Sequence, residues 1–443
     1  MADVENDVKR EDVKQQEREA FLEGENAPSD KWNLVYWIVL LHGIGTLMPW
    51  NMFINIAPSY YVQHKMVEIG TGPNGTNVPT WYSDNFMHYL GICSQVPNLL
   101  LNLINIFVPV KGELTPRITI SLAIVGGVVA FTDAFVYIDT NTWISGFFWL
   151  TMLSIAVLNG ANGVYQNSIY GLASDFPFKY TNAVIIGNNL CGTFVAIVSI
   201  VAAYLTDSKT YQAFGYFTVS LITIVCCFFS FFKLRTLNYY KFFSDLGNLK
   251  RAKEDTGPPT MDDYVATFKQ GWQQFMNVFL VFFVTLTIFP NIMVFIRPYL
   301  KGGEYNFLLP ESQYINFCVF LLFNVFAFLG SLTANQVQFP KPEGLWVATW
   351  ARVLLIPFFM LCNFRPETRT WGVWFESYYL YIVGAILMSF TSGYLSSLGM
   401  MYAPRVVEKS KGRIAGMMAA FFLILGIVSG LFFTIFIAKL VDN

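Results

Sequence analysis

The sequence predicts an all-α polytopic membrane protein with 11 transmembrane helices, and three observations support this fold class. Of the 443 residues, 54% are hydrophobic and only 13% are charged, whereas a soluble protein carries about 25% charged residues. Eleven apolar stretches follow one another, most of them near the length of about 20 residues that crosses a bilayer. Most Lys and Arg residues fall in alternate connections between these stretches, as membrane insertion requires.

A polar segment precedes the first apolar stretch. Residues 1–31 mix acidic and basic side chains with few large apolar ones, so we expect a cytoplasmic N-terminal tail rather than a cleavable signal peptide. The spans are expected near residues 32–55, 85–110, 117–138, 143–173, 180–206, 212–234, 272–297, 312–337, 346–362, 373–403 and 412–440.

Two long connections organise the spans. An extracellular loop is expected at residues 56–84, and a cytoplasmic loop at 235–271 separates an N-terminal six-helix bundle, 32–234, from a C-terminal five-helix bundle, 272–443. This six-plus-five division predicts a major-facilitator-like pair of bundles around a central path. No residue-level repeat between the halves is visible, so this symmetry rests on the count of spans.

The orientation follows from the basic residues. Lys and Arg predominate in the connections that lie inside if the N-terminus is cytoplasmic, and an odd number of helices then puts the C-terminus outside. Asn74 opens an Asn-Gly-Thr glycosylation sequon in the first loop, which this topology places outside.

The first span carries an unusual group at its centre. Pro49 removes a backbone donor and bends the helix, and Trp50 and Asn51 follow directly. An indole ring can stack on a heterocycle, and an amide can hydrogen-bond a neutral polar ligand. The alternative is that Trp50 belongs to the aromatic belt where the helix leaves the bilayer.

Uncharged polar side chains recur within other spans. Asn159, Asn162 and Gln166 share one helix face, Gln95 and Asn98 flank Pro97, and Asn324 follows Phe320 by one turn. These amides either join helix to helix or line a path through the membrane. Such a path suits a neutral, hydroxyl-rich solute with an aromatic part, and it suits an ion poorly.

Ionisable residues within the spans are few, mainly His42, Asp133, Arg352 and Glu376. His42 or Asp133 could relay protons in a coupled carrier, although an isolated histidine is more often a packing residue. Arg352 needs acceptors or water at its depth. The sequence contains no HExxH, P-loop or GxSxG element, so we expect neither an enzyme, nor a metal, nor a cofactor. The six cysteines lie in apolar stretches, and no basic patch predicts a nucleic-acid partner.

Several motifs, in order along the chain, resemble those of the equilibrative nucleoside transporter family, solute carrier family 29. The resemblance covers residues 32–443, and its motifs are Gly43-Ile44-Gly45-Thr46-Leu47-Met48-Pro49-Trp50-Asn51, Tyr170-Gly171-Leu172-Ala173 after Gln166, Tyr180-Thr181, Phe323-Asn324-Val325-Phe326, Ser331-Leu332-Thr333-Ala334, Ala351-Arg352-Val353, Pro357, Leu361-Cys362-Asn363, Ser392-Gly393-Tyr394-Leu395-Ser396-Ser397-Leu398 and Ala415-Gly416 through Gly426 and Gly430.

The resemblance implies facilitated diffusion of nucleosides. It also implies cavity positions: Leu47 and Trp50 flank the nucleoside, Gln166 hydrogen-bonds the base, and Gln95, Asn98, Phe320, Asn324, Ile427 and Arg352 match residues of the family's helices. With Asn51 and Asn162 from the residue analysis, these form the expected site. We expect a monomer in the lipid bilayer of the plasma membrane, with an organelle membrane as the alternative.

The chain departs from the family at one pair of positions. The family's eighth helix usually carries an Asp and an Arg four residues apart, and here Ala327 and Ser331 stand in their place. That pair would bind ribose hydroxyls through charge-assisted hydrogen bonds. Three outcomes stay open: weak nucleoside binding, a preference for another solute such as a nucleobase, or recognition by the amides of the second and fourth spans. A membrane sensor that binds without transport is a further alternative.

Overall fold

The computed structural model describes residues 28–68, 78–107, 114–253, 260–296, 298, 305, 307–309, 314–364, 369 and 372–442. Within them, eleven helical stretches are long and apolar enough to cross a membrane. The prediction of an all-α protein with 11 transmembrane helices is therefore confirmed, with two strands, β1 (Val67–Glu68) and β2 (Val78–Pro79), as a short antiparallel addition. The predicted glycosylation residue Asn74 lies outside the described residues.

The N-terminal half contains six long helices. They are α2 (Leu34–Ile56), which continues as the π-helix η2 (Ala57–Lys65), α3 (Trp81–Phe107), α4 (Thr115–Phe135), α5 (Ile144–Ala173), α6 (Phe178–Leu205) and α7 (Lys209–Thr236). The 16-residue helix α8 (Asn238–Lys253) follows. Helix α8 and the first residues of α9 both fall within the segment predicted as the loop 235–271, so the described part of this segment is largely helical.

The C-terminal half contains α9 (Met261–Ile288), the short 3-10 turn η4 (Met293–Phe295), the π-helix η5 (Asn316–Leu321) continued by α11 (Leu322–Gln336), α14 (Tyr378–Tyr402) and α15 (Gly412–Asp442). The ninth span is broken into α12 (Leu345–Ala351), the 3-10 turn η7 (Arg352–Leu354) and α13 (Leu355–Leu361). Further 3-10 turns are η1 (Lys31–Asn33), η6 (Pro342–Gly344), η8 (Ala403–Arg405) and η9 (Lys409–Lys411).

The two halves pair their helices in the same way. In the N-terminal half α2 packs on α6 and α3 on α5, and in the C-terminal half α9 packs on α15 and α11 on α14. Small residues allow each contact: a Cβ on Gly187 would collide with the backbone of α2, and one on Gly393 would collide with the carbonyl of Ala327. The equivalent pairings are the structural repeat that the sequence does not display.

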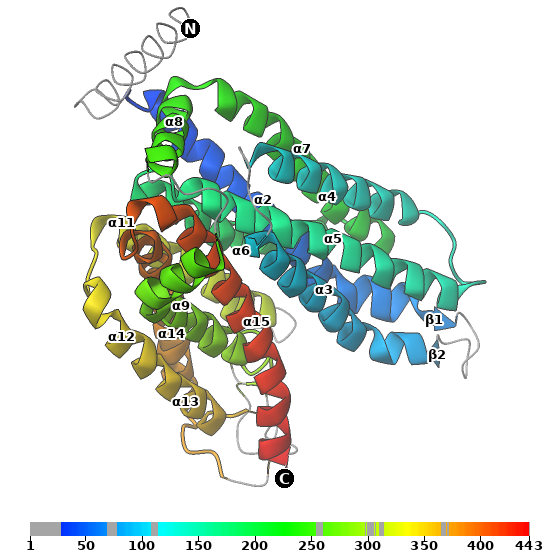
Figure 1. Ribbon diagram of the computed structural model, residues 1–443. Helices are drawn as coiled ribbons and strands as arrows, with labels where there is room; N and C mark the ends of the chain where they lie inside the picture. The colour runs from blue at the N-terminus through cyan, green and yellow to red at the C-terminus, as the bar shows by residue number, and fades with distance from the viewer. Residues whose placement is uncertain are drawn as a thin grey trace, which may run out of the picture.

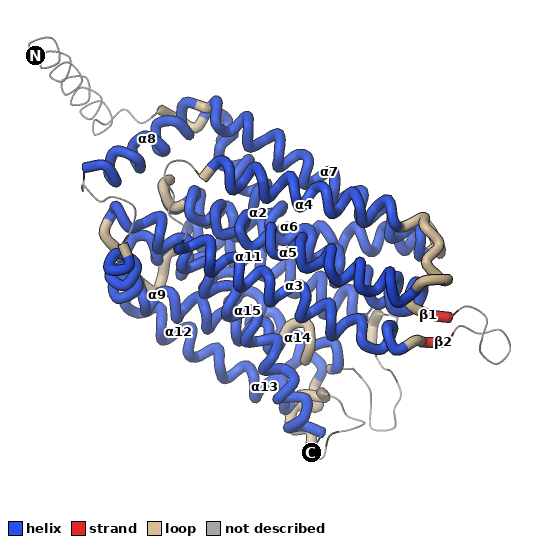
Figure 2. The backbone as a smooth tube through the Cα atoms, turned by 45° about the vertical axis from the view of Figure 1, so that its right-hand side comes forward, coloured by secondary structure: helices blue, strands red, loops and turns tan. Residues whose placement is uncertain are grey.

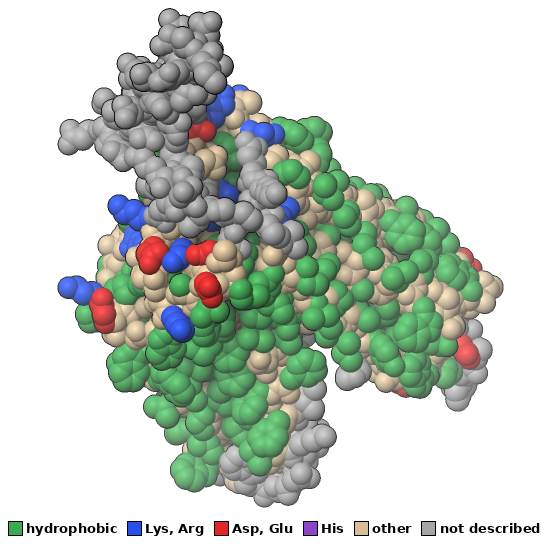
Figure 3. Space-filling model, viewed as in Figure 1, with side chains coloured by type: hydrophobic (Ala, Val, Ile, Leu, Met, Phe, Trp, Pro, Cys, Tyr) green, Lys and Arg blue, Asp and Glu red, His purple; other side chains and the backbone are tan. Residues whose placement is uncertain are grey.

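The halves form a V (Figure 1). Helices α3, α4, α5 and α7 extend to the right of the view, whereas α12, α13 and α15 extend downward, and the two arms meet at the upper left. We name the joined side, where α2 begins and α8 lies, the basic side, because Lys and Arg gather there (Figure 3). The opposite side carries β1 and β2 (Figure 2), and we name it the hairpin side.

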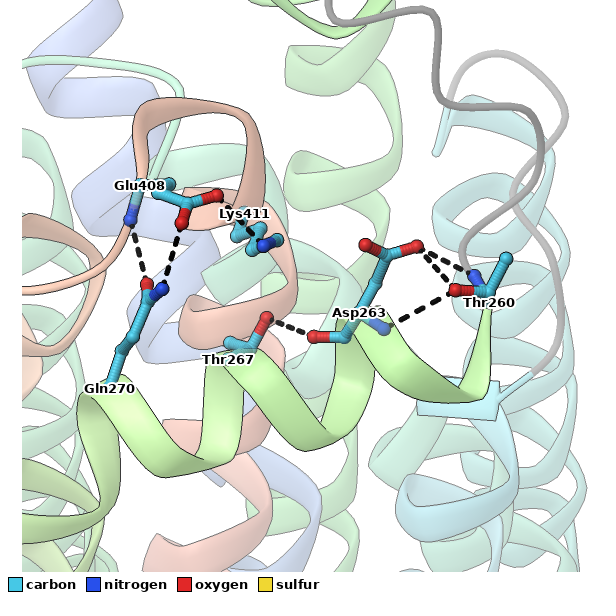
Figure 4. Close-up of polar contacts among 6 residues, drawn as sticks. All are labelled: Thr260, Asp263, Thr267, Gln270, Glu408 and Lys411. Carbon is cyan, nitrogen blue, oxygen red and sulfur yellow. Dashed lines mark hydrogen bonds and ion pairs between the residues drawn. The ribbon is translucent and has the colours of Figure 1, made fainter.

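Polar contacts on the basic side hold the start of α9 to the connection before α15 (Figure 4). Thr260 caps α9, since its hydroxyl accepts from the Asp263 backbone N–H while the Asp263 carboxylate accepts from the Thr260 backbone. Gln270 Nε2 donates to Glu408 Oε1 at 2.9 Å, and Lys411 pairs with Glu408 at 2.7 Å. Hydrogen bonds to Lys411 and Gln270 lower the pKa of Glu408.

Candidate functional site

A pocket of about 320 Å³ lies between the two halves, within the range of about 300–1,000 Å³ typical of small-molecule sites. Its lining residues come from α2, α3 and α6 of one half, and from α9 and the turn after it, η5, α11 and α15 of the other. They are Trp50, Asn51, Ile54, Asn55, Met87, Gly91, Ile92, Gln95, Gly192, Ala196, Leu286, Phe289, Pro290, Asn291, Phe320, Asn324, Val428, Leu431 and Phe432.

The pocket opens toward the hairpin side. Met87 and Ile92 on α3 and Phe432 on α15 are respectively 38%, 37% and 51% exposed, and the surface shows a notch between the two arms of the V (Figure 3). The lining residues stand on the halves of α2, α6 and α15 that approach the hairpin side, and on the half of α3 that starts there.

Aromatic rings form much of the pocket wall. Trp50 is half-buried and directly follows Pro49 within α2. From the other half, the rings of Phe289 and Phe320 meet edge to face with centroids 5.6 Å apart, and Phe289 stacks on Phe323 at 3.8 Å. Flat rings on both sides of a narrow pocket can receive a planar heterocycle between them.

Amide side chains supply the polar part of the wall. Asn55 Nδ2 donates to the Asn51 carbonyl at 2.7 Å, Asn51 Nδ2 contacts Cys191 Sγ at 3.5 Å, and Asn324 Nδ2 donates to the Phe320 carbonyl at 2.9 Å. These bonds orient the amides and leave further donor and acceptor capacity for a ligand. None of the lining residues is ionisable, so the pocket favours a neutral ligand, since an unpaired charge there would lose its hydration.

Contacts between the halves close the basic side. The Arg413 guanidinium on α15 pairs with the Asp175 carboxylate after α5, and Asn167 Nδ2 donates to the Met417 carbonyl at 2.9 Å. The Arg405 guanidinium lies 4.2 Å from the centre of the Phe178 ring. The structure is therefore open on one side and sealed on the other.

The structure brings five of the predicted site residues together in this pocket: Trp50, Asn51, Gln95, Phe320 and Asn324. Leu47, Asn98 and Ile427 do not line it. Each lies on a pocket-lining helix, one to three residues closer to the basic side than Trp50, Gln95 and Val428 respectively.

Two predicted residues on α5 lie outside the pocket as well. Asn162 Nδ2 donates to the Thr46 carbonyl at 2.7 Å, joining α5 to α2, and Gln166 is 3% exposed. Among the described residues, neither Asn162 Oδ1 nor the nearby Asn98 Oδ1 has a hydrogen-bond partner. Buried amide oxygens of this kind can accept bonds from a ligand or from water.

The predicted site residue Arg352 stands apart from the pocket lining. The residue is 3% exposed, and its guanidinium donates to Thr285 Oγ1 at 2.9 Å and to the carbonyls of Val281 and Met388 at 3.3 Å. These acceptors belong to α9 and α14. The geometry is therefore that of a cation that holds three segments of the C-terminal half together where the ninth span breaks.

The two positions that depart from the family are part of a helix junction. Ala327 and Ser331 are 1% and 0% exposed. Ser331 Oγ accepts from Asn189 Nδ2 at 2.5 Å, and its carbonyl accepts from Asn182 Nδ2 at 2.8 Å. Neutral hydrogen bonds between α6 and α11 thus occupy the place where the family pair would stand.

The candidate proton relays also lie elsewhere. His42 Nδ1 is 2.6 Å from the hydroxyl of Tyr165 in the buried interface of α2 and α5, and Asp133 Oδ2 accepts from Thr218 Oγ1 at 3.2 Å between α4 and α7. Neither lines the pocket. Among the described residues, no group of three His, Cys, Asp or Glu side chains could hold a metal ion.

Several lining residues escaped the sequence analysis, and Asn55 and Asn291 matter most because they are polar. Asn55 follows Asn51 by one helical turn, so its spacing was a usable signal. Asn291 follows Pro290 in the turn after α9, and an Asn in such a turn is ordinary. Only the tertiary structure shows that it faces the other half.

Comparisons with known proteins agree with this geometry. A family model described as nucleoside transporter matches residues 152–439. Equilibrative nucleoside transporter 3 of Rattus norvegicus is 27% identical and covers 92% of this chain and 89% of its own length. Equilibrative nucleoside transporter 1 of Homo sapiens is 27% identical and covers 92% of this chain and 97% of its own length.

Among solved structures, the major facilitator superfamily proton:xylose symporter XylE has a TM-score of 0.64 at 9% identity, covering 92% of this chain and 89% of that one. The human organic anion transporter MFSD10 has a TM-score of 0.53 at 14% identity, covering 90% and 92%. These likenesses concern the fold alone, and they confirm the predicted major-facilitator-like arrangement. Together with the family match, they identify the chain as a multi-pass membrane protein that belongs to the nucleoside transporter family.

Proposed function

We propose that the chain carries nucleosides down their gradient by alternating access, with the pocket between the halves as the substrate site. The observation that carries this proposal is the position of the pocket, which is open on the hairpin side and separated from the basic side by cross-half contacts. Rocking of the two halves about the site would open the basic side and close the hairpin side.

In this proposal each part of the wall recognises one part of the substrate. Trp50 stacks on the base, opposite the rings of Phe289 and Phe320, and Gln95, Asn51, Asn55, Asn291 and Asn324 bond the base edge and the sugar. Leu47, Asn98, Asn162, Gln166 and Ile427 form the next part of the path and meet the substrate as the basic side opens. The depth of Leu47, Asn98 and Ile427 on the pocket-lining helices supports this order, as do the side-chain oxygens of Asn98 and Asn162, which have no hydrogen-bond partner among the described residues.

The uncharged lining sets the limits of the substrate class. A nucleotide would bring its phosphate charge into a pocket whose lining residues include no cation, so nucleotides and ions are excluded. Because Ala327 and Ser331 are engaged in a helix junction, the sugar is recognised by neutral amides only. Loss of the ribose hydroxyls therefore costs less affinity than it would with a charged pair, and nucleobases are a second substrate class.

The organisation in the membrane is part of the proposal. Residues 32–234 and 272–443 are the moving halves, connected by the cytoplasmic segment 235–271 after the tail 1–31. The basic side is cytoplasmic, so the pocket faces outward. The gathering of Lys and Arg on that side supports this orientation. The monomer is the working unit, in the plasma membrane, and the chain needs neither a catalytic group nor a cofactor.

Uptake of labelled adenosine and uridine into vesicles that contain the purified chain tests the proposal. We expect saturable uptake without an ion gradient, competition by nucleosides and nucleobases, and none by nucleoside monophosphates. A proton-coupled carrier would instead show flux that depends on external pH between about 5.5 and 8, a range that spans the ordinary histidine pKa of about 6.5. The place of His42 and Asp133 away from the pocket favours pH-independent flux.

A further inference from the structure

Gly192 on α6 and Asn324 on α11 meet across the seam between the two halves, and both line the pocket. A Cβ built on Gly192 would lie 2.5 Å from Asn324 Cγ and 3.0 Å from Asn324 Nδ2, and closer still to Asn324 Oδ1. The three nearest atoms all belong to this one amide. The space that any other residue at 192 would fill is therefore occupied by the side chain of Asn324.

The contact fixes how the Asn324 amide is turned. Its Nδ2 donates to the Phe320 carbonyl, one turn earlier on the same helix, at 2.9 Å, and its Oδ1 lies against Gly192. An amide nitrogen has two hydrogens, and the bond to Phe320 uses one. With the oxygen turned toward α6, the group that Asn324 can present to the pocket is its second N–H.

Other glycines of the chain differ from Gly192 in what they contact. Gly187, one and a half turns earlier on α6, would bring a Cβ into the backbone of α2, so its role is helix packing. Gly91 lines the same pocket but has open space where its Cβ would be. Gly192 alone among these three faces a movable polar side chain from the opposite half.

We propose that Gly192 is a positioning residue that sets the donor orientation of Asn324 and so selects ligands with a hydrogen-bond acceptor, a ring nitrogen or a carbonyl oxygen, at that point. This inference rests on the proposed nucleoside site and names one determinant of its specificity. A side chain at 192 displaces the Asn324 amide. Since the obstacle is the end of a side chain rather than backbone, the variant protein still folds.

The test compares uptake kinetics of labelled adenosine in vesicles for wild type, Gly192→Ala, Asn324→Ala and the double variant, normalised to the amount of folded protein. We expect Gly192→Ala to raise KM about tenfold with Vmax within twofold, the loss of one hydrogen bond being worth up to about tenfold. Asn324→Ala raises KM similarly. The double variant is no worse than Asn324→Ala, because the displaced group is already absent.

Two control variants separate this effect from added volume and from glycine substitution in general. Gly91→Ala adds the same methyl group to the pocket wall without meeting another side chain and should raise KM less than Gly192→Ala does. Gly215→Ala on α7, outside the pocket and with open space around it, should leave KM unchanged.

The outcomes are distinguishable. A Gly192→Ala variant with wild-type KM, or a double variant whose KM rises by the product of the two single effects, overturns the positioning role while nucleoside transport stands. If wild type itself shows neither saturable uptake nor nucleoside-dependent thermal stabilisation, the proposed function fails, and this inference fails with it.

Discussion

At the scale of single residues, the pocket combines rings and amides without charge, and in the proposed site each type has a separate task. Trp50 offers a face for stacking, while the amides of Gln95 and Asn324 offer directed bonds. This division means that substitutions should affect affinity for chemically different parts of a substrate rather than act uniformly.

Replacing Trp50 by Ala should raise KM for adenosine at least tenfold, and Trp50→Phe should raise it less. Base–aromatic stacking contributes about 1–3 kcal/mol, and phenylalanine retains part of the ring face. Uptake kinetics in vesicles check this. Trp37→Ala is the matched control, because Trp37 stands on the same helix, is 58% exposed and lies outside the pocket. Equal effects of the two alanine variants would assign Trp50 to the aromatic belt.

Replacing Arg352 by Ala should lower the thermal midpoint of the purified protein while the fraction that stays folded binds nucleoside normally. The guanidinium bonds Thr285 and two carbonyls of α9 and α14, and hydrogen bonds to charged groups are worth about 1.5–3 kcal/mol each. Thermal unfolding and nucleoside titration of the same sample measure both effects. A stable variant with weakened binding would show that Arg352 meets the substrate directly.

At the scale of elements, apolar runs identified the spans well because bilayer thickness fixes their length. The same rule missed α8, since a helix of 16 residues with many charges carries no transmembrane signal. It also read the ninth span as continuous, although the helix changes to a 3-10 turn at Arg352–Leu354, where hydropathy does not change. Local composition predicts insertion, whereas breaks within a span depend on side-chain partners from other helices.

The π-helix η2 supplies a prediction about pH. Burial, and then the nearby Lys65 charge, lower the pKa of His64, whose ring Nε2 lies 3.2 Å from Thr210 Oγ1 on α7. The folded state therefore binds this proton less readily than the unfolded chain does. The stability from His64 is present above its ordinary pKa of about 6.5 and is lost as pH falls toward the lowered value.

The thermal midpoint should thus decrease more between pH 7.5 and pH 5.5 for wild type than for His64→Gln. The glutamine keeps a polar group near Thr210 and cannot take up a proton in this range. A decline of the same size in both proteins would show that other groups cause the pH dependence.

At the scale of the whole molecule, the candidate site forms because two halves meet, and the sequence could predict only part of it. Five predicted residues line the pocket because each already stood out within its own span. Asn291, Phe432 and Gly192 did not, since what makes them relevant is the opposite half. The depth of Gln166 relative to Trp50 likewise depends on how the helices are staggered, which no periodicity within one helix encodes.

The closed basic side supplies a prediction about conformation. Asp175→Asn removes the ion pair with Arg413, and breaking a buried charge pair typically costs several kcal/mol, so the population should shift toward opening of the basic side. Spin labels can be placed at Tyr211 and Tyr379, which lie on the hairpin side of the two different halves. The fraction of molecules with a short distance between the labels should be larger in the variant than in wild type.

Glu408→Gln is the control for that measurement. Its partner Lys411 lies in the same half, and the Glu408 side chain is exposed on the surface, so the label distances should stay as in wild type. A shift of equal size in both variants would show that the Asp175–Arg413 pair does not specifically keep the basic side closed.

Counterflow in vesicles tests most directly whether a single nucleoside site is exposed to each side of the membrane in turn. Vesicles containing the purified chain are loaded with unlabelled uridine and diluted into labelled uridine at equal pH and ionic composition. We predict that label accumulates transiently above its external concentration and then returns to equality, and that Trp50→Ala weakens this overshoot. Binding without any overshoot, or accumulation that appears only with an imposed ion gradient, would contradict alternating access to one nucleoside site.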